Sequence, residues 1–157
     1  MGVDRTYAIR QHRRFMDSWF KLDRNYCRLL KRWDISINTL WVLEHLQRHP
    51  EGGEPAVLAD QVNMLRQTMT LTLDQLEKRG YLCRTPHKTD RRRKIVTLTP
   101  PGQAFAAEVL DVVTGFELAA MEALTGEELE ALVESSVKYQ EAFEKRLESE
   151  SKNGSGE

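Results

Sequence analysis

The chain has 157 residues and a formal net charge of −1; 40% of its residues are hydrophobic and 30% are charged. This balance excludes a disordered chain and favours a single folded globular domain. No apolar run approaches the roughly 18 residues of a membrane span, the N-terminus lacks the apolar stretch of a secretory signal, and the two cysteines make neither a disulfide framework nor a paired metal motif.

The net charge conceals a strong asymmetry along the chain. Residues 1–65 carry 10 Lys/Arg and 8 Asp/Glu, residues 66–94 carry 9 and 3, and residues 95–157 carry 4 and 13, which gives net charges of +2, +6 and −9. A basic middle segment between a nearly neutral start and an acidic end favours a surface that binds a polyanion. A charged surface that is merely solvated is the alternative.

Residues 5–33 are predicted to form one long helix, because apolar side chains recur there in steps of three and four. This stripe consists of Phe15, Trp19, Leu22, Tyr26, Leu29 and Trp33. A second helix is expected from Ser36, whose hydroxyl can cap it, to His49, because the following proline disfavours helical geometry at that residue. Residues 51–54 are expected to form a loop.

A helix-turn-helix is predicted next. Its first helix covers about residues 55–62, residues 63–65 form the turn, and its second helix runs over about 66–79 and ends at Gly80. The second helix turns an apolar face inward, formed by Met69, Leu73 and Leu76.

Two short strands are predicted after this helix, at residues 81–83 and 94–99, joined by a basic tip at 88–93. The order of helix, strand, charged tip and strand is typical of the second half of a winged helix-turn-helix.

Two further helices are predicted beyond the wing. Thr99 can cap a helix of about residues 101–123, with a stripe of Phe105, Val109, Val112, Phe116, Ala119 and Ala123. Thr125 and Glu128 form a capping box for the last helix, whose stripe is Leu129, Leu132, Ser136, Tyr139, Phe143 and Leu147. A small winged helix cannot cover three striped helices, so we expect a homodimer with a two-fold axis.

The predicted fold is therefore mainly α with a small β-wing. One cytoplasmic domain is expected over residues 1–150, with a winged helix core at about 36–99 between dimerisation helices at 5–33 and 101–149. Residues 151–157 are expected to form a disordered tail.

Four short motifs follow one another in the basic segment and just after it. They are Gln67-Thr68-Met69-Thr70, Leu76-Glu77-Lys78-Arg79-Gly80, Asp90-Arg91-Arg92, and Leu98-Thr99 with Gly102. With these motifs and its order of helices, the sequence resembles the MarR family of bacterial winged-helix regulators. The resemblance implies a homodimeric DNA-binding transcriptional regulator, usually a repressor, whose recognition helix enters the major groove of a palindromic operator and whose wing reaches the adjacent minor groove.

One position departs from the family pattern. Leu65 stands where members usually have Ser or Thr as the cap of the recognition helix. Leucine offers no side-chain acceptor to the first turn, so we expect this turn to fray or to be completed by a DNA phosphate.

The predicted recognition helix presents five candidate DNA contacts on its exposed face or first turn. They are Arg66, Gln67, Thr68, Thr70 and Leu71. Gln can pair with adenine, Arg with guanine, and a Thr or Leu methyl group can touch the methyl group of thymine. Ordinary polar surface residues are the alternative interpretation.

On the wing, Arg92 is the candidate for insertion into a narrow A·T-rich minor groove. Phosphate contacts are expected from Lys88, Arg91, Arg93 and Lys94. By family resemblance, Asp74 on the recognition helix could pair with Arg92 and orient the wing.

The resemblance also implies a small aromatic or phenolic acid as effector, bound between the dimer helices and the winged helix. The residues expected nearest such a pocket are Tyr26, Trp33, Trp41 and His45. Aromatic side chains at helical spacing are more often core residues, and this alternative stays open.

Other functions are weighed on the same residues. A thiol-based redox sensor would use Cys27, although no resolving cysteine is evident. The histidines show no metal-site spacing with a third ligand, and no catalytic constellation or nucleotide motif indicates an enzyme or a cofactor. A winged helix that binds only protein is the main rival, but it would need neither a basic wing tip nor a Gln/Thr-rich helix front.

Overall fold

The structure is a computed structural model that describes residues 2–87, 89–90 and 92–153. They form two compact units, one up to Val113 and one from Thr114. The prediction of a single domain over residues 1–150 therefore stays a prediction, and each unit is described by itself. None of the helices in the described ranges combines the length and apolar character needed to cross a bilayer.

The first unit begins with α1 (Arg5–Leu30), which continues into a short 3-10 helix, η1 (Lys31–Trp33). The carboxylate of Asp4 accepts a hydrogen bond from the Tyr7 N–H at 3.1 Å and caps the first turn. The helical segment ends at Asp34, whose φ of 55° lies in the left-handed region. The apolar stripe predicted one helix over residues 5–33, and the structure differs only in the tighter last turn.

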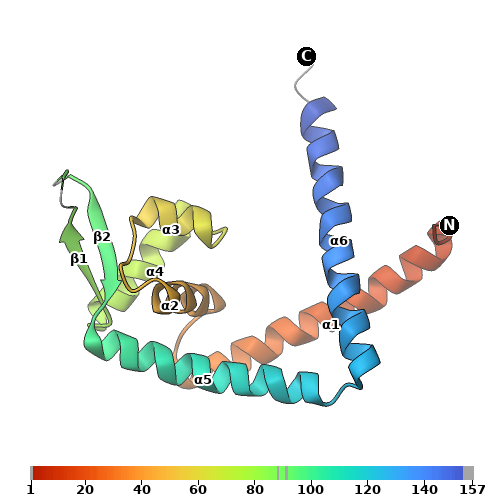
Figure 1. Cartoon of the computed structure of the whole chain (residues 1–157), viewed down its shortest axis with the longest axis horizontal. Coiled ribbons are helices and arrows are strands. Elements are labelled where there is room, and N and C mark those ends of the chain that lie inside the picture. The colour runs from red at the N-terminus through yellow and green to blue at the C-terminus, as the bar shows by residue number, and fades with distance from the viewer. Residues whose placement is uncertain (1, 88, 91, 154–157) are drawn as a thin grey trace. The chain divides into compact units, whose positions relative to one another are not determined.

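The helices of the winged-helix core are α2 (Ile37–Arg48), α3 (Pro55–Gln61) and α4 (Arg66–Lys78). Ser36 caps α2 as predicted, since its hydroxyl accepts the Thr39 N–H at 3.2 Å. The predicted left-handed turn residue Asn63 has a φ of 52°, and the predicted helix stop Gly80 has a φ of 74°. Figure 1 shows α2, α3 and α4 gathered beside the hairpin.

The wing is an antiparallel hairpin of β1 (Leu82–Pro86) and β2 (Lys94–Leu98), in a register that pairs Leu82 with Leu98 and Pro86 with Lys94. The loop expected at residues 51–54 also joins the sheet, because Gly53 forms a two-bond bridge with Val96. Gly52, at a φ of 71°, packs so closely that a Cβ there would lie 2.0 Å from the Val96 carbonyl oxygen. This approach requires a glycine at position 52.

The core of the first unit lies under the winged helix and reaches α1 and the start of α5 (Pro100–Glu122). The predicted inward residues of α4, Met69, Leu73 and Leu76, are all buried. Other fully buried side chains are Leu30, Leu40, Val42, Leu43, Leu58, Val96 and Val109. One shared core therefore fixes the inner face of α4 against every other element of the winged helix.

Helix α1 exposes many large apolar side chains over most of its length. The large apolar side chains that it exposes are Tyr7, Ile9, Phe15, Trp19, Phe20 and Leu22. The later members of its predicted stripe, Tyr26, Leu29 and Trp33, instead pack partly against the core. The stripe is thus divided between a buried end and an exposed end.

The second unit contains the end of α5 and the helix α6 (Gly126–Asn153). The predicted capping box is present, because Thr125 and Glu128 exchange hydrogen bonds between side chains and backbone N–H groups. The predicted start of the disordered tail, residue 151, is too early, because α6 continues through residues 151–153. Residues 154–157 lie outside the described part.

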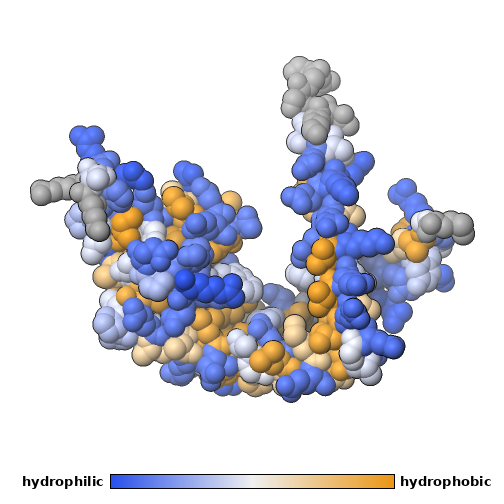
Figure 2. All heavy atoms as spheres, in the orientation of Figure 1, coloured by the Kyte–Doolittle hydropathy of each residue, from blue (hydrophilic) through white to orange (hydrophobic). Residues whose placement is uncertain are grey.

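Helix α6 is apolar along one side but buries none of its described residues. Its exposed large apolar side chains are Leu132, Val133, Val137, Tyr139, Phe143 and Leu147. Figure 2 shows apolar side chains gathered along this helix. An apolar stripe of this length normally packs against another surface.

Candidate nucleic-acid interface

The start of α4 projects from the winged helix without a side-chain cap among the described residues. Leu65 occupies the cap position with extended backbone angles, and its side chain is 79% exposed. The missing side-chain cap expected at Leu65 is therefore confirmed. The first N–H groups of α4 are available to an anion.

The outer face of α4 carries the predicted base-contacting residues. Arg66, Gln67, Thr70 and Leu71 are exposed, whereas Thr68 is half-buried. The Thr70 hydroxyl donates to the Arg66 carbonyl at 3.0 Å, so this hydroxyl is already bonded within the helix. Arg66 lies 3.7 Å from the Asp60 carboxylate; both side chains are largely exposed, so this ion pair contributes little.

The wing tip is organised by Asp90. Its carboxylate accepts the Arg92 N–H at 3.0 Å, and its carbonyl accepts the Arg93 N–H at 3.0 Å. These bonds form a tight turn that leaves Arg92 exposed at the tip. Lys94 is also exposed, while the predicted contacts Lys88 and Arg91 lie outside the described residues.

Asp74 does orient toward the wing, but its partner differs from the expected one. Its carboxylate binds Arg84 of β1 at 2.6 Å instead of Arg92. Arg84 also binds Glu77, one turn further along α4. The strand places Arg84 directly over α4, whereas Arg92 lies beyond the ends of both strands. Asp74 therefore pairs with Arg84 and not with Arg92.

Arg93, at the end of the tip next to β2, is engaged by Glu54. Its guanidinium binds both carboxylate oxygens of Glu54, the Nε bond measuring 2.8 Å. These hydrogen bonds are the main cause of a lowered pKa of Glu54. A phosphate contact by Arg93 would have to compete with Glu54, so it stays a prediction.

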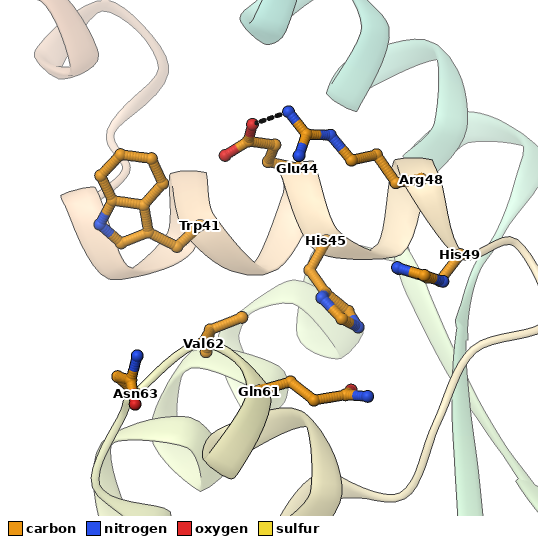
Figure 3. A pocket seen from close by; sticks show the side chains of 8 residues that line it. All are labelled: Trp41, Glu44, His45, Arg48, His49, Gln61, Val62 and Asn63. Carbon is orange, nitrogen blue, oxygen red and sulfur yellow. Dashed lines mark hydrogen bonds and ion pairs between the residues drawn. The ribbon is translucent and has the colours of Figure 1, made fainter. Parts of the chain in front are cut away.

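A hollow of about 290 Å³ lies between α2 and the turn of the helix-turn-helix. Figure 3 shows His45 pointing from α2 toward Gln61 and Val62, with Trp41 one turn earlier on the same helix. It is lined by Trp41, Glu44, His45, Arg48, His49, Gln61, Val62 and Asn63. Two of the four predicted effector residues therefore meet at one site.

The charges around this hollow are largely balanced. Burial, and then the neighbouring His49, lower the pKa of His45 and favour its neutral form. The rings of His45 and His49 are stacked with centroids 4.5 Å apart, and Arg48 binds Glu44 at 2.6 Å. A neutral imidazole at His45 beside the indole of Trp41 suits a planar aromatic ligand.

The other two predicted effector residues lie elsewhere. Tyr26 is half-buried against the core. Trp33 is half-buried too, and its indole N–H donates to Glu108 of α5 at 2.8 Å. Neither residue lines the hollow.

The structure gives little support to a thiol sensor or a metal site. Cys27 is exposed and Cys83 is half-buried, and the two are not bonded to each other. Within the described ranges, no three His, Cys, Asp or Glu side chains are grouped as a metal site would require.

Sequence reasoning missed the residues that hold the interface in place. Glu54 and Arg84 were not singled out, and Glu77 and Arg79 were named only within a motif, without a structural role. Only the excess of basic residues on the wing pointed to such partners, because pairs distant in sequence depend on the fold.

Comparison with known proteins agrees with this geometry. The model of the MarR family matches residues 35–94, which cover α2 to the beginning of β2. Over these residues the chain is similar to the MarR family. The matched structures include proteins described as transcription regulators.

The MarR-type fold extends over most of the chain. The MarR family regulator SP03579 superposes with a TM-score of 0.78 at 20% identity, covering 91% of this chain and 97% of that one. CouR, a transcriptional repressor bound to a 23-mer DNA duplex, gives 0.69 at 25% identity, covering 87% and 92%. The S. aureus MepR–DNA complex gives 0.66 at 21% identity, covering 90% and 99%. At these identities, the likeness establishes the fold.

The uncapped start of α4 leads to a stability prediction. Leu65→Ser supplies the missing acceptor, so we expect its free energy of unfolding to exceed that of Leu65→Ala by about 0.5–2 kcal/mol. Urea unfolding of the two variants measures this difference, and little packing is lost because the leucine is exposed. Equal stabilities would contradict the assignment of residue 65 as the cap.

Proposed function

We propose that this chain is a homodimeric, sequence-specific DNA-binding transcriptional regulator. The observation that carries the proposal is the pair of faces on α4: Met69, Leu73 and Leu76 are buried, while Arg66, Gln67 and Leu71 are exposed beside an uncapped helix start. A helix held in this way can enter the major groove and read base edges without unfolding the core.

The wing supplies the second DNA contact. Arg92 at its tip is exposed, and the turn made by Asp90 holds its backbone. Arginine is attracted to the strong negative potential of a narrow minor groove. The exposed Lys94 is suited to a phosphate contact. A protein-binding winged helix would have no use for this arrangement.

Repression is the proposed outcome of binding. The similar protein CouR is described as a transcriptional repressor bound to DNA, and the resemblance to the MarR family favours the same role here. A dimer that occupies a palindromic operator within a promoter would exclude other proteins from it.

The wing assignment is tested by removing one charge. We expect Arg92→Ala to weaken binding to an operator duplex by about tenfold or more, because a minor-groove contact is lost. Fluorescence anisotropy with a labelled duplex measures the affinity, and sedimentation should find the oligomeric state unchanged. Arg146→Ala in α6, which removes the same charge elsewhere, serves as the control. An unchanged affinity for Arg92→Ala would refute the wing assignment.

Dimerisation is proposed from the uncovered apolar stripes of α1 and α6. Both helices expose large apolar side chains over several turns, more than scattered surface residues account for. A two-fold axis would let equivalent helices of two protomers cover one another.

A charge within the stripe should therefore dissociate the dimer. We expect Phe143→Glu to shift the protein toward monomers and to abolish operator binding, because one winged helix holds one half-site only. Lys145→Glu, two residues away and outside the predicted stripe, should remain dimeric. Sedimentation equilibrium decides; a Phe143→Glu dimer as stable as that of the original chain would exclude this face from the interface.

The hollow beside the turn is the proposed effector site. A small aromatic acid would place its ring near Trp41 and His45, and its carboxylate could take the place of Glu44 on Arg48. Ligand binding there would act on the turn that precedes α4. This supports release from DNA by a small aromatic ligand.

Salicylate is a suitable probe for this site. Isothermal titration should detect binding, and we expect His45→Ala to weaken it about tenfold, a loss of about 1.4 kcal/mol. Gln47→Ala, on the same helix but outside the hollow, should bind salicylate unchanged. Equal losses in both variants, or no binding by the original chain, would contradict the assignment.

A further inference from the structure

Arg79 stands at the junction of the recognition helix and three other parts of the first unit. It is the C-cap residue of α4, between Lys78 and Gly80, and its own backbone N–H bonds to the carbonyl of Gln75. The next two N–H groups, of Gly80 and Tyr81, bond back to Glu77 and Leu76 at 2.9 and 3.0 Å. This pattern is a Schellman motif, which fixes the point from which the side chain departs.

The guanidinium of Arg79 reaches the end of the α1 and η1 segment. Its Nη2 donates to the Trp33 carbonyl at 3.1 Å, and its Nη1 donates to the Asp34 carbonyl at 3.4 Å. Carbonyls at a helix C-terminus lack partners within the helix and carry the negative end of its dipole. A cation with two donors therefore fits this end well.

The same guanidinium contacts two aromatic rings. Its Cζ atom lies 5.1 Å from the ring centroid of Tyr81 and 5.2 Å from that of Phe105. The two rings are themselves stacked, 4.3 Å apart at 11°. Both distances are within the range of cation–π attraction. Arg79 thus joins η1, the approach to β1 and the first turns of α5.

The elements joined here have different tasks in the proposed function. Helix α1 exposes Phe15, Trp19 and Leu22, which belong to the proposed dimer surface, and α4 carries the base contacts. Trp33, whose carbonyl accepts from Arg79, also donates through its indole to Glu108 of α5. The joint therefore links the dimer-forming helix to the DNA-reading helix directly.

We infer that Arg79 is a positioning residue that sets the distance between the two recognition helices of the dimer. This inference rests on the proposed function, since it requires a dimer that binds two half-sites. The separation of half-sites in an operator follows the separation of the recognition helices. Loosening the joint lets each α4 tilt against its own α1, so operators of altered spacing become less disfavoured.

The neighbouring lysine provides a matched control. Lys78 is exposed on α4 and carries the same charge as Arg79, so Lys78→Met removes one positive charge at nearly the same place. Arg79→Met keeps the length of the stem and removes both donors and the charge. Arg79→Lys keeps the charge. It lacks the planar guanidinium that bonds to two carbonyls and stacks on the rings at the same time.

The test compares operator spacings. Duplexes are first selected by the original chain from a random pool; the best palindrome is then remade with one base pair added or removed at its centre. We expect the original chain and Lys78→Met to lose about tenfold or more in affinity at altered spacing, and Arg79→Met and Arg79→Lys to lose less than about threefold. Sedimentation should find all four proteins dimeric.

The possible outcomes distinguish a failure of the proposed function from a failure of the positioning role of Arg79. If the original chain selects no duplex, the proposed function itself fails. If it selects one and both Arg79 variants keep its spacing preference, the positioning role is wrong and the proposed function stands. If Lys78→Met loses the preference as well, charge alone explains the effect and the positioning role is again wrong. If Arg79→Met does not fold, Arg79→Lys decides between these results.

Discussion

The burial of one face of α4 is the constraint on which the rest of the structure depends. Met69, Leu73 and Leu76 are almost completely removed from solvent, in a core shared with α2, α3, the wing and α5. Such a packed core resists rotation of the helix about its axis. The residues facing outward are therefore fixed in direction, which is what reading a rigid groove requires. The same core reaches only the end of α1, and the apolar stripes of α1 and α6 are exposed.

The arginines of the basic segment have different roles. Arg84 is held by Asp74 and Glu77, and Arg93 by Glu54, so these two fasten the wing to α4 and to the start of α3. Arg79 fastens α4 to η1. Arg92, in contrast, is presented at the tip by its backbone turn. Part of the high positive charge in the sequence therefore stabilises the fold, while Arg92 is left exposed at the tip.

Local signals in the sequence accounted for most of the fold. Caps at Ser36 and Thr125, the turn at Asn63 and the stop at Gly80 depend on neighbouring residues, and the structure confirms each of them. The exposed and buried faces of α4 followed from spacing alone. Partners across the fold could not be predicted in the same way. Asp74 was paired with the wrong arginine because the register of β1 over α4 is a tertiary property.

The proposed effector site illustrates the same limit. Trp41 and His45 are one helical turn apart and do line one hollow, whereas Tyr26 and Trp33 belong to other surroundings. Helical spacing places residues on one face of their own helix. It does not say which other helix faces them.

The salt dependence of DNA binding tests the central claim most directly. The duplex upstream of the chain's own gene would be titrated with the protein between 50 and 200 mM salt. If α4 and the wing of two protomers lie on phosphates, the logarithm of the affinity should fall linearly with the logarithm of salt, by about a hundredfold or more over this range. No binding at 50 mM salt, or an affinity that does not change with salt, would contradict the account and favour a winged helix that binds protein.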